Sequence, residues 1–264
     1  MRPTTRLVIS CFEMRVFVTP MNPRTTQLAI DLIIPAFNEQ ANIKPLFEAL
    51  AHNRLRHIVV VDNGSTDATA ELARQAGAIV VREPQRGYGA ACLAGIACLK
   101  EHAASRNPPD VVAFLDADLS DDPGHLAAVC EPLVRGEADM VIGSRVRLAQ
   151  QGALTPPQRC GNALAVTLIR WCTGTRYSDL GPMRAIRWAS LQELNMADRT
   201  WGWTVEMQYK AATAGLAVSE VDVPYHHRHA GTSKISGSIV GSARAGWKIL
   251  STIAALWWRS PRKR

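Results

Sequence analysis

Two carboxylates stand one residue apart directly after a run of apolar residues. The segment FLDADLSDDP, residues 114–123, places Asp116 and Asp118 at the end of a predicted strand. Two hard oxygen ligands at this spacing suit Mg²⁺ or Mn²⁺ held partly by protein and partly by phosphate. The same segment also fits an acidic loop that caps the next helix, because Asp121 and Asp122 precede Pro123. From these residues alone, metal ligation and helix capping both remain open.

Two further polar segments lie between apolar runs. In VVDNGSTDAT, residues 60–69, Asp62 ends a predicted strand and Gly64 permits a tight turn. The Asp62 carboxylate suits a ribose or a base, but a strand–turn–helix unit without a ligand is equally allowed. In RGYGAA, residues 86–91, two glycines at a helix start would let a ligand approach the backbone. Glycine patterns this short also recur by chance.

The elements that position these residues follow from periodicity. Short apolar runs alternate with amphipathic stretches, which predicts a parallel sheet covered by helices. Ligands of such a sheet lie at the carboxyl ends of its strands, so the polar residues above should meet in one crevice. The predicted strands are 29–35, 57–61, 78–81, 111–115, 140–143 and 217–223, and the predicted helices are 40–52, 67–76, 89–102, 123–135, about sixteen residues ending near Thr173, 203–214 and 238–258.

The net charge of +7 is concentrated near the C-terminus. The chain has 264 residues, with 30 Lys plus Arg against 23 Asp plus Glu. Residues 226–264 contain eight basic residues and no acidic one, which leaves 22 basic and 23 acidic residues, about −1, elsewhere. This distribution argues against nucleic acid as a partner and for an anion met near the C-terminus. Six scattered cysteines without a CxxC pair favour reduced thiols in the cytoplasm.

The motifs resemble those of family 2 glycosyltransferases. IIPAFNE, VVDNGSTD, RGYGAA, DADL and IGSR occur in the order and approximate spacing of that family, and the resemblance covers about residues 29–257. It implies the α/β GT-A fold, a Rossmann-like, mostly parallel sheet with helices on both faces, here with a C-terminal amphipathic helix. It also implies that Asp116 and Asp118 hold Mg²⁺ or Mn²⁺, and that the nucleotide sugar is bound by Pro35, Phe37, Glu39, Asp62, Gly89, Asp116 and Ala117. The family usually has a second acidic residue where this chain has Asn63.

The second half narrows the resemblance. SDLGPMRAIR and WTVEMQYKAATAGLAVSEVDVPYHHRHAGTSKISG look like the polyprenyl-phosphate hexose synthases, the group that includes dolichyl-phosphate mannose synthase. This implies inverting transfer of a hexose from a nucleoside diphosphate sugar, of the GDP-mannose or UDP-glucose type, to a polyprenyl phosphate. The implied catalytic residues are Asp118, Arg145, Arg228 and Lys234, and the implied acceptor-phosphate site is Arg145, Arg159, Asp179, Ser233 and Lys234.

Two other functions remain open at this stage. A lipid phosphate is already ionised, whereas a hydroxyl acceptor needs a general base, for which Asp179 and Glu206 are the candidates. The segment TWGWTVEMQ lacks the acidic pair that many hydroxyl-using relatives carry. The alternatives are therefore a family 2 enzyme with a hydroxyl acceptor, or a non-catalytic nucleotide-sugar-binding protein. His226, His227 and His229 are candidates for a third metal ligand or for loop packing.

We expect three regions along the chain. Residues 1–27 read as an extension, 28–237 as the catalytic domain and 238–264 as an amphipathic helix with a basic tail. Within the domain, 28–145 should bind the nucleotide sugar and 146–237 the acceptor. The last helix is too short in apolar residues to span a bilayer. It suits either the inner face of the membrane, as the anchor of a peripheral cytoplasmic enzyme, or packing on the domain.

Overall fold

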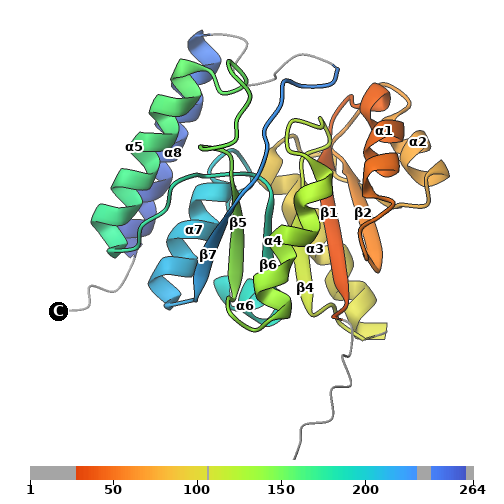
Figure 1. Ribbon diagram of the computed structural model, residues 1–264, viewed down its shortest axis with the longest axis horizontal. Helices are drawn as coiled ribbons and strands as arrows, with labels where there is room; N and C mark the ends of the chain where they lie inside the picture. Colours follow the sequence, from red (N-terminus) through yellow and green to blue (C-terminus); the bar gives the residue numbers. More distant parts are fainter. Residues whose placement is uncertain (1–27, 106, 231–238, 260–264) are drawn as a thin grey trace, which may run out of the picture.

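A seven-stranded sheet forms the centre of the protein (Figure 1). The computed structural model describes residues 28–105, 107–230 and 239–259. The strand order is β3-β2-β1-β4-β6-β5-β7. The strands are β1 (Ile30–Ala36), β2 (His57–Asp62), β3 (Ile79–Arg82), β4 (Val111–Phe114), β5 (Met140–Ser144), β6 (Arg184–Arg187) and β7 (Val218–Asp222).

The sheet is mostly parallel, as predicted. β1 pairs in parallel with β2 and β4, β2 with β3, and β5 with β7. Strand β6 is the exception, because it runs antiparallel between β4 and β5. Strand β6 was not predicted from the sequence, because Arg184 interrupts its short apolar pattern. In the structure the Arg184 guanidinium is fully buried and donates to the carbonyl oxygens of Leu180, Gly181 and Thr204.

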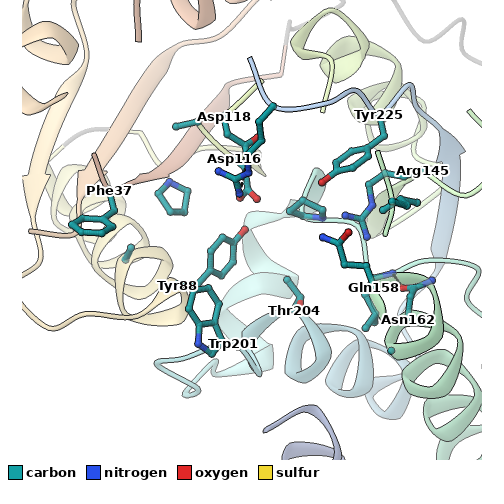
Figure 2. Close-up of a pocket in the computed structure, with 18 of the residues that line it drawn as sticks. Phe37, Tyr88, Asp116, Asp118, Arg145, Gln158, Asn162, Trp201, Thr204 and Tyr225 are labelled. Carbon is teal, nitrogen blue, oxygen red and sulfur yellow. Dashed lines mark hydrogen bonds and ion pairs between the residues drawn. The ribbon is translucent and has the colours of Figure 1, made fainter. Parts of the chain in front are cut away.

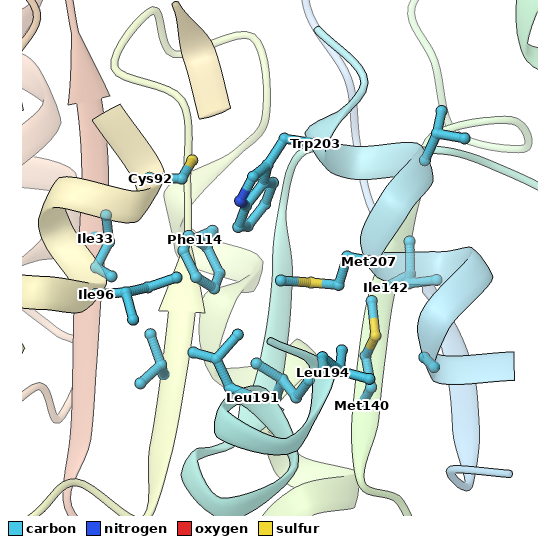
Figure 3. Close-up of a cluster of buried hydrophobic side chains, with 14 of the residues drawn as sticks. Ile33, Cys92, Ile96, Phe114, Met140, Ile142, Leu191, Leu194, Trp203 and Met207 are labelled. Carbon is cyan, nitrogen blue, oxygen red and sulfur yellow. The ribbon is translucent and has the colours of Figure 1, made fainter. Parts of the chain in front are cut away.

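Helices cover both faces of the sheet, which confirms the predicted α/β class. α1, α2 and α4 pack on one face, whereas α3, α6 and α7 pack on the other. Figure 3 shows the core under the second group, where Trp203 of α7 packs on Phe114 of β4 at 4.8 Å between ring centroids. The helices are α1 (Gln40–Leu50), α2 (Thr69–Gln75), α3 (Tyr88–Ser105), the short 3₁₀ turn η1 (Pro123–His125), α4 (Leu126–Val134), α5 (Pro156–Thr173), α6 (Trp188–Leu194), α7 (Trp203–Ala214) and α8 (Ile239–Arg259).

Two long helices lie side by side at one end of the molecule, outside α7 (Figure 1). α5 begins with a capping box in which Thr155 and Gln158 bond reciprocally, and it ends at Gly174 in the left-handed conformation. α8 buries Ile253 against the core but leaves Trp247 and Trp258 exposed. Among the described residues, no helix has the length and apolar character needed to cross a membrane.

Candidate active site

A cavity of about 610 Å³ opens at the carboxyl ends of the strands. Phe37 and Glu39 reach it after β1, Asp116 and Asp118 after β4, and Arg145 after β5. Figure 2 shows Phe37 on one side, Gln158 and Asn162 of α5 on the opposite side, and the two carboxylates between them. The segment after β7 contributes Tyr225 and Arg228. The crevice predicted from strand ends is therefore present, and it extends to α5 and α8.

The two carboxylates differ in their surroundings. Asp118 is buried; its Oδ1 accepts from the backbone N of Ser120 at 2.9 Å, and its Oδ2 lies 2.7 Å from Nη2 of Arg228. The buried Oδ1 of Asp116 has no hydrogen-bond partner among the residues that the structure describes. Burial, reinforced by the charge of Asp118, raises the pKa of Asp116 to about 7. A divalent cation would relieve both the repulsion and the missing partner, so this pair fits the predicted metal.

The protein offers few other metal ligands here. Across the described parts of the chain, no group of three or more His, Cys, Asp or Glu side chains could hold a metal ion. The backbone N of His229 donates to the carbonyl of Asp118, and its ring Nδ1 lies 3.3 Å from Oδ1 of Asn42. The capping alternative holds for Asp122, whose side chain accepts from the backbone N of Gly124. Asp116 and Asp118 remain the residues that could hold a metal.

The segment 225–230 lies across the carboxylates and fixes Arg228. The backbone N of His226 donates to the carbonyl of Ser120 at 2.7 Å. Arg228 reaches Asp118 and also lies 3.8 Å from Oε1 of Glu39. Glu39 in turn accepts from Asn42. These contacts place a guanidinium group beside the carboxylates. The predicted Ser233 and Lys234 lie outside the described residues.

Arg145 is held by a buried acid. Its backbone N, Nε and Nη2 donate to the Asp179 carboxylate at 2.9, 2.7 and 2.8 Å, and its guanidinium lies 5.0 Å from the Tyr225 ring centroid. Although burial acts in the opposite direction in each case, the hydrogen bonds between them raise the pKa of Arg145 and lower that of Asp179. Asp179 therefore positions Arg145 at the cavity wall. Arg159 lies exposed on α5, beside the cavity-lining Gln158.

The second motif holds the loop before α3. Asp62 is buried and accepts from the backbone N of Ser65 at 2.8 Å. Asn63 lines the cavity, donates to the carbonyls of Glu83 and Gln85, and accepts from the backbone N of Gly87. A second aspartate could not donate these two bonds, which gives a physical reason for the amide. Asn63 therefore holds the loop 83–87 in place, a role that was not predicted from the sequence.

The RGYGAA motif, residues 86–91, is contacted by another segment of the same chain, residues 198–200. A Cβ on Gly89 would lie 2.0 Å from the carbonyl oxygen of Asp198, and one on Gly87 would lie 2.2 Å from that of Arg199. The backbone N atoms of Gly89 and Ala90 donate to the carbonyls of Thr200 and Arg199. The two glycines would let a ligand approach here, but in the structure segment 198–200 occupies this position. Arg86, Tyr88 and Ala91 of this motif line the cavity, and the hydroxyl of Tyr88 points toward Asp116 (Figure 2).

Further lining residues were not singled out from sequence. Arg86 stacks 3.6 Å from the Phe37 ring centroid and donates to the carbonyl of Gly64. Arg86 and Tyr88 belong to the RGYGAA motif, and Tyr225 immediately precedes the histidine cluster. Their position in or beside these motifs is the sequence feature from which they could have been predicted to line the cavity. Glu206, the other candidate base, is buried away from the lining residues; it accepts from the backbone N of Ala197 and Asp198 and pairs with Lys210 at 2.7 Å.

The comparisons with known proteins agree with this geometry. The model of the family described as glycosyl transferase family 2 matches residues 31–194. An uncharacterized glycosyltransferase of Mycobacterium tuberculosis is 37% identical over 84% of this chain and 98% of its own length. Polyprenol monophosphomannose synthase of Mycolicibacterium smegmatis is 30% identical over 85% and 87%. Glucosyl-3-phosphoglycerate synthase of M. tuberculosis, solved with Mn²⁺ and UDP, has a TM-score of 0.66 at 20% identity and covers 89% of this chain and 82% of its own.

The fold, the carboxylate pair and these relatives define the protein as a glycosyltransferase with the GT-A fold. The family model matches more than half of the chain, so the chain belongs to glycosyl transferase family 2.

Proposed function

We propose that the protein transfers a hexose from a nucleoside diphosphate sugar to a polyprenyl phosphate lipid, with inversion. The observation that carries this proposal is the division of the cavity. Carboxylates and guanidinium groups gather at the strand ends, while the α5 and α8 side is walled by apolar groups, among them Leu154, Leu180 and Ile249. A donor diphosphate and an acceptor that joins a phosphate to a hydrocarbon chain fit these two environments.

On the donor side, each group has a proposed role. Pro35, Phe37, Glu39 and Ala117 line the cavity where the nucleotide would lie. Asp116 and Asp118 would hold Mg²⁺ or Mn²⁺, which supplies Lewis-acid neutralisation of the departing diphosphate. Asp62 and Gly89 would act indirectly, through the loops that they hold. The solved relatives named as complexes with Mn²⁺ or Mg²⁺ and UDP support this assignment. A donor of the GDP-mannose or UDP-glucose type is compatible with it.

On the acceptor side, the phosphate itself is the nucleophile. The candidate bases Asp179 and Glu206 are already engaged, the first by Arg145 and the second by backbone N–H groups and Lys210. A phosphate oxygen needs no deprotonation, so an engaged acid at these positions is compatible with turnover. Arg145 and Arg228 would bind the acceptor phosphate through the N–H groups that their carboxylate partners leave available. Lys234, Ser233 and Arg159 are proposed to extend this cationic site.

Two named relatives support a lipid phosphate acceptor. One is the polyprenol monophosphomannose synthase, and the other is dodecaprenyl-phosphate galacturonate synthase of Rhizobium johnstonii, 28% identical over 81% of this chain and 63% of its own length. An acceptor of this kind resides in a bilayer, so the enzyme has to meet the membrane surface. We propose that α8 and its basic tail make this contact at the inner face, without spanning the bilayer.

The test is an acceptor screen. Labelled hexose transfer is measured from GDP-mannose and UDP-glucose with Mn²⁺, to polyprenyl phosphate, to the matching polyprenol, and to free sugars. We expect transfer to the phosphate alone. Transfer to an alcohol or a sugar would instead establish a hydroxyl acceptor, and donor binding without turnover on any acceptor would indicate a non-catalytic protein.

A paired variant tests the carboxylates. The Asp116→Ala, Asp118→Ala double variant should lose transfer by at least about a thousandfold. The matched control replaces Glu137 and Glu193, two exposed carboxylates far from the lining residues, by Ala and should retain it. Equal turnover by the double variant and the wild type would refute the proposed metal role.

A further inference from the structure

The polar side chains on the α5 side of the cavity are partly used by the protein itself. Asn162 donates through Nδ2 to the carbonyl of Ser178 at 3.1 Å and accepts at Oδ1 from the backbone N of Leu180 at 2.8 Å. Oε1 of Gln158 accepts from both the backbone N and the hydroxyl of Thr155. Both residues line the cavity and appear beside each other in Figure 2. The carbonyl oxygens of both amides are therefore engaged, which leaves the Nε2 group of Gln158 and the hydroxyl of Thr204 as the polar groups of this end.

Apart from Thr204, most of the other lining residues between Tyr88 and α5 are apolar. The carbon-rich lining residues are Leu154, Pro157, Leu180, Pro182, Trp201 and Ile249. They come from the loop before α5, from α5 itself, from the segments before β6 and α7, and from α8. Such a surface favours contact with hydrocarbon, since burying apolar area stabilises a complex in proportion to the area removed from water.

Two glycines on the neighbouring helices leave room at this end. Gly161 of α5 and Gly246 of α8 both line the cavity, and a Cβ built on either meets no atom of the described residues within 4 Å. α5 and α8 pack against each other. Neither helix contains an acidic residue. We call the place where Gly161, Gly246 and Ile249 meet the cavity the α5–α8 seam.

The outer sides of the same two helices carry exposed indoles. Trp171 of α5 is 89% exposed, and Trp247 and Trp258 of α8 are 74% and 82% exposed. Trp247 directly follows the cavity-lining Gly246, so a chain that left the cavity between the two helices would emerge beside an exposed indole.

We propose that the hydrocarbon chain of the acceptor leaves the cavity through the α5–α8 seam, and that Gly161 and Gly246 set the width available to it. The inference rests on the proposed lipid phosphate acceptor and adds the path of its chain. The ligand class is a long isoprenoid chain, held by contact with apolar side chains and by helices that are free of negative charge. The two glycines would then be specificity-determining residues, because a side chain at either position occupies space the chain needs.

The test compares acceptors that share a phosphate and differ in chain length. Transfer is measured to geranyl phosphate and to undecaprenyl phosphate for the wild type, Gly161→Leu and Gly246→Leu. We expect each variant to lower the ratio of long-chain to short-chain kcat/KM by at least about tenfold. Leucine favours the helix over glycine, so both variants should fold. Circular dichroism checks this, and Gly161→Ala should give a smaller change in the same direction.

Matched controls place leucine on the same helices away from the cavity. Ala163→Leu on α5 and Ala254→Leu on α8 alter exposed positions outside the lining and should keep the wild-type ratio. An unchanged ratio in both glycine variants, with transfer to both acceptors intact, overturns the chain path and leaves the proposed function standing. Failure of the wild type to use either phosphate would instead overturn the proposed function, and the chain path with it.

Discussion

At the scale of single residues, the main feature of the site is Asp116, a buried carboxylate with one oxygen that accepts no hydrogen bond from the described residues. Asp116 lies beside Asp118, and its Oδ1 is without a hydrogen-bond donor among the described residues. Burial and the neighbouring charge together place its pKa near neutrality. Asp118 instead has a backbone N–H and Arg228 as partners. The two carboxylates therefore differ, and Asp116 has to lose its proton before the pair can bind a metal as two carboxylates.

Metal affinity should accordingly depend on pH. Below about 7 Asp116 retains its proton, which a cation has to displace, so the apparent affinity for Mn²⁺ should rise roughly tenfold per pH unit up to that point and level off above it. Titration calorimetry or electron paramagnetic resonance of Mn²⁺ at several pH values measures this. Asp116→Asn should bind more weakly and lose the dependence. A flat profile for the wild type would contradict the proposal.

Asn63 acts at the same scale, through neutral hydrogen bonds. Asn63→Asp removes two donors from the carbonyls of Glu83 and Gln85 and directs a negative charge at them. We expect a loss of about 1 kcal/mol or more in the free energy of unfolding, because two partly buried carbonyls lose their donors and face a carboxylate. Urea unfolding measures it. The control Gln192→Glu, on the exposed side of α6, should change stability by less than about 0.5 kcal/mol. Equal stability of the two variants would show that Asn63 does not clamp the loop.

At the scale of elements, most strands could be predicted from the sequence but β6 could not. β1 to β5 and β7 follow from apolar runs that end in turn residues. The pattern RAIR of β6 carries arginines at both ends, and only the carbonyls that surround Arg184 make its burial tolerable. Similarly, the motifs located Asp116 and Asp118, whereas the clamp made by Asn63 and the contact of 198–200 with Gly89 depend on segments far apart in sequence.

One such long-range contact helps to hold α8, whose Ile253 is buried in the core. Lys248 pairs with Asp198 at 2.8 Å, and Asp198 also accepts from Thr200. Lys248→Met should speed hydrogen exchange in α8 several-fold, since a partly exposed pair contributes about 1 kcal/mol or less. Burial acts to raise the pKa of Asp198, but bonds from Lys248 and Thr200 lower it, so the pair stabilises the fold above pH 3.8 and is lost below it.

The difference between Lys248→Met and the wild type should therefore disappear in acid. Lys44→Met removes a fully surface pair with Glu48 and serves as the control, with exchange in α8 unchanged. If both variants exchange like the wild type at neutral pH, Lys248 does not hold the helix.

At the scale of the whole molecule, the features proposed to meet a membrane gather at one end of the protein. α5 and α8 lie together there and carry Trp171, Trp247 and Trp258 on exposed positions. Arg159 and Arg170 add positive charge from α5. The cavity reaches both helices, so the proposed membrane contact and the proposed acceptor entry belong to the same end of the molecule.

Replacing the three indoles should detach the enzyme from lipid. We expect the Trp171→Ala, Trp247→Ala, Trp258→Ala variant to bind phosphatidylglycerol vesicles at least about tenfold more weakly in sedimentation, while its melting temperature changes little because the side chains are exposed. Val134→Ala, an exposed apolar residue on α4, is the control. Undiminished vesicle binding by the triple variant would remove these helices from the membrane contact.

The pairing of β5 has a consequence for how the chain is made. β5 at residues 140–144 pairs with β6 and β7, whose residues follow it by about forty and eighty positions. A nascent chain that has emerged only as far as Arg145 holds β5 with neither neighbour. The sheet is completed only when β7 leaves the ribosome, so this enzyme should remain exposed to chaperones for most of its synthesis and acquire protease resistance late and in a single step.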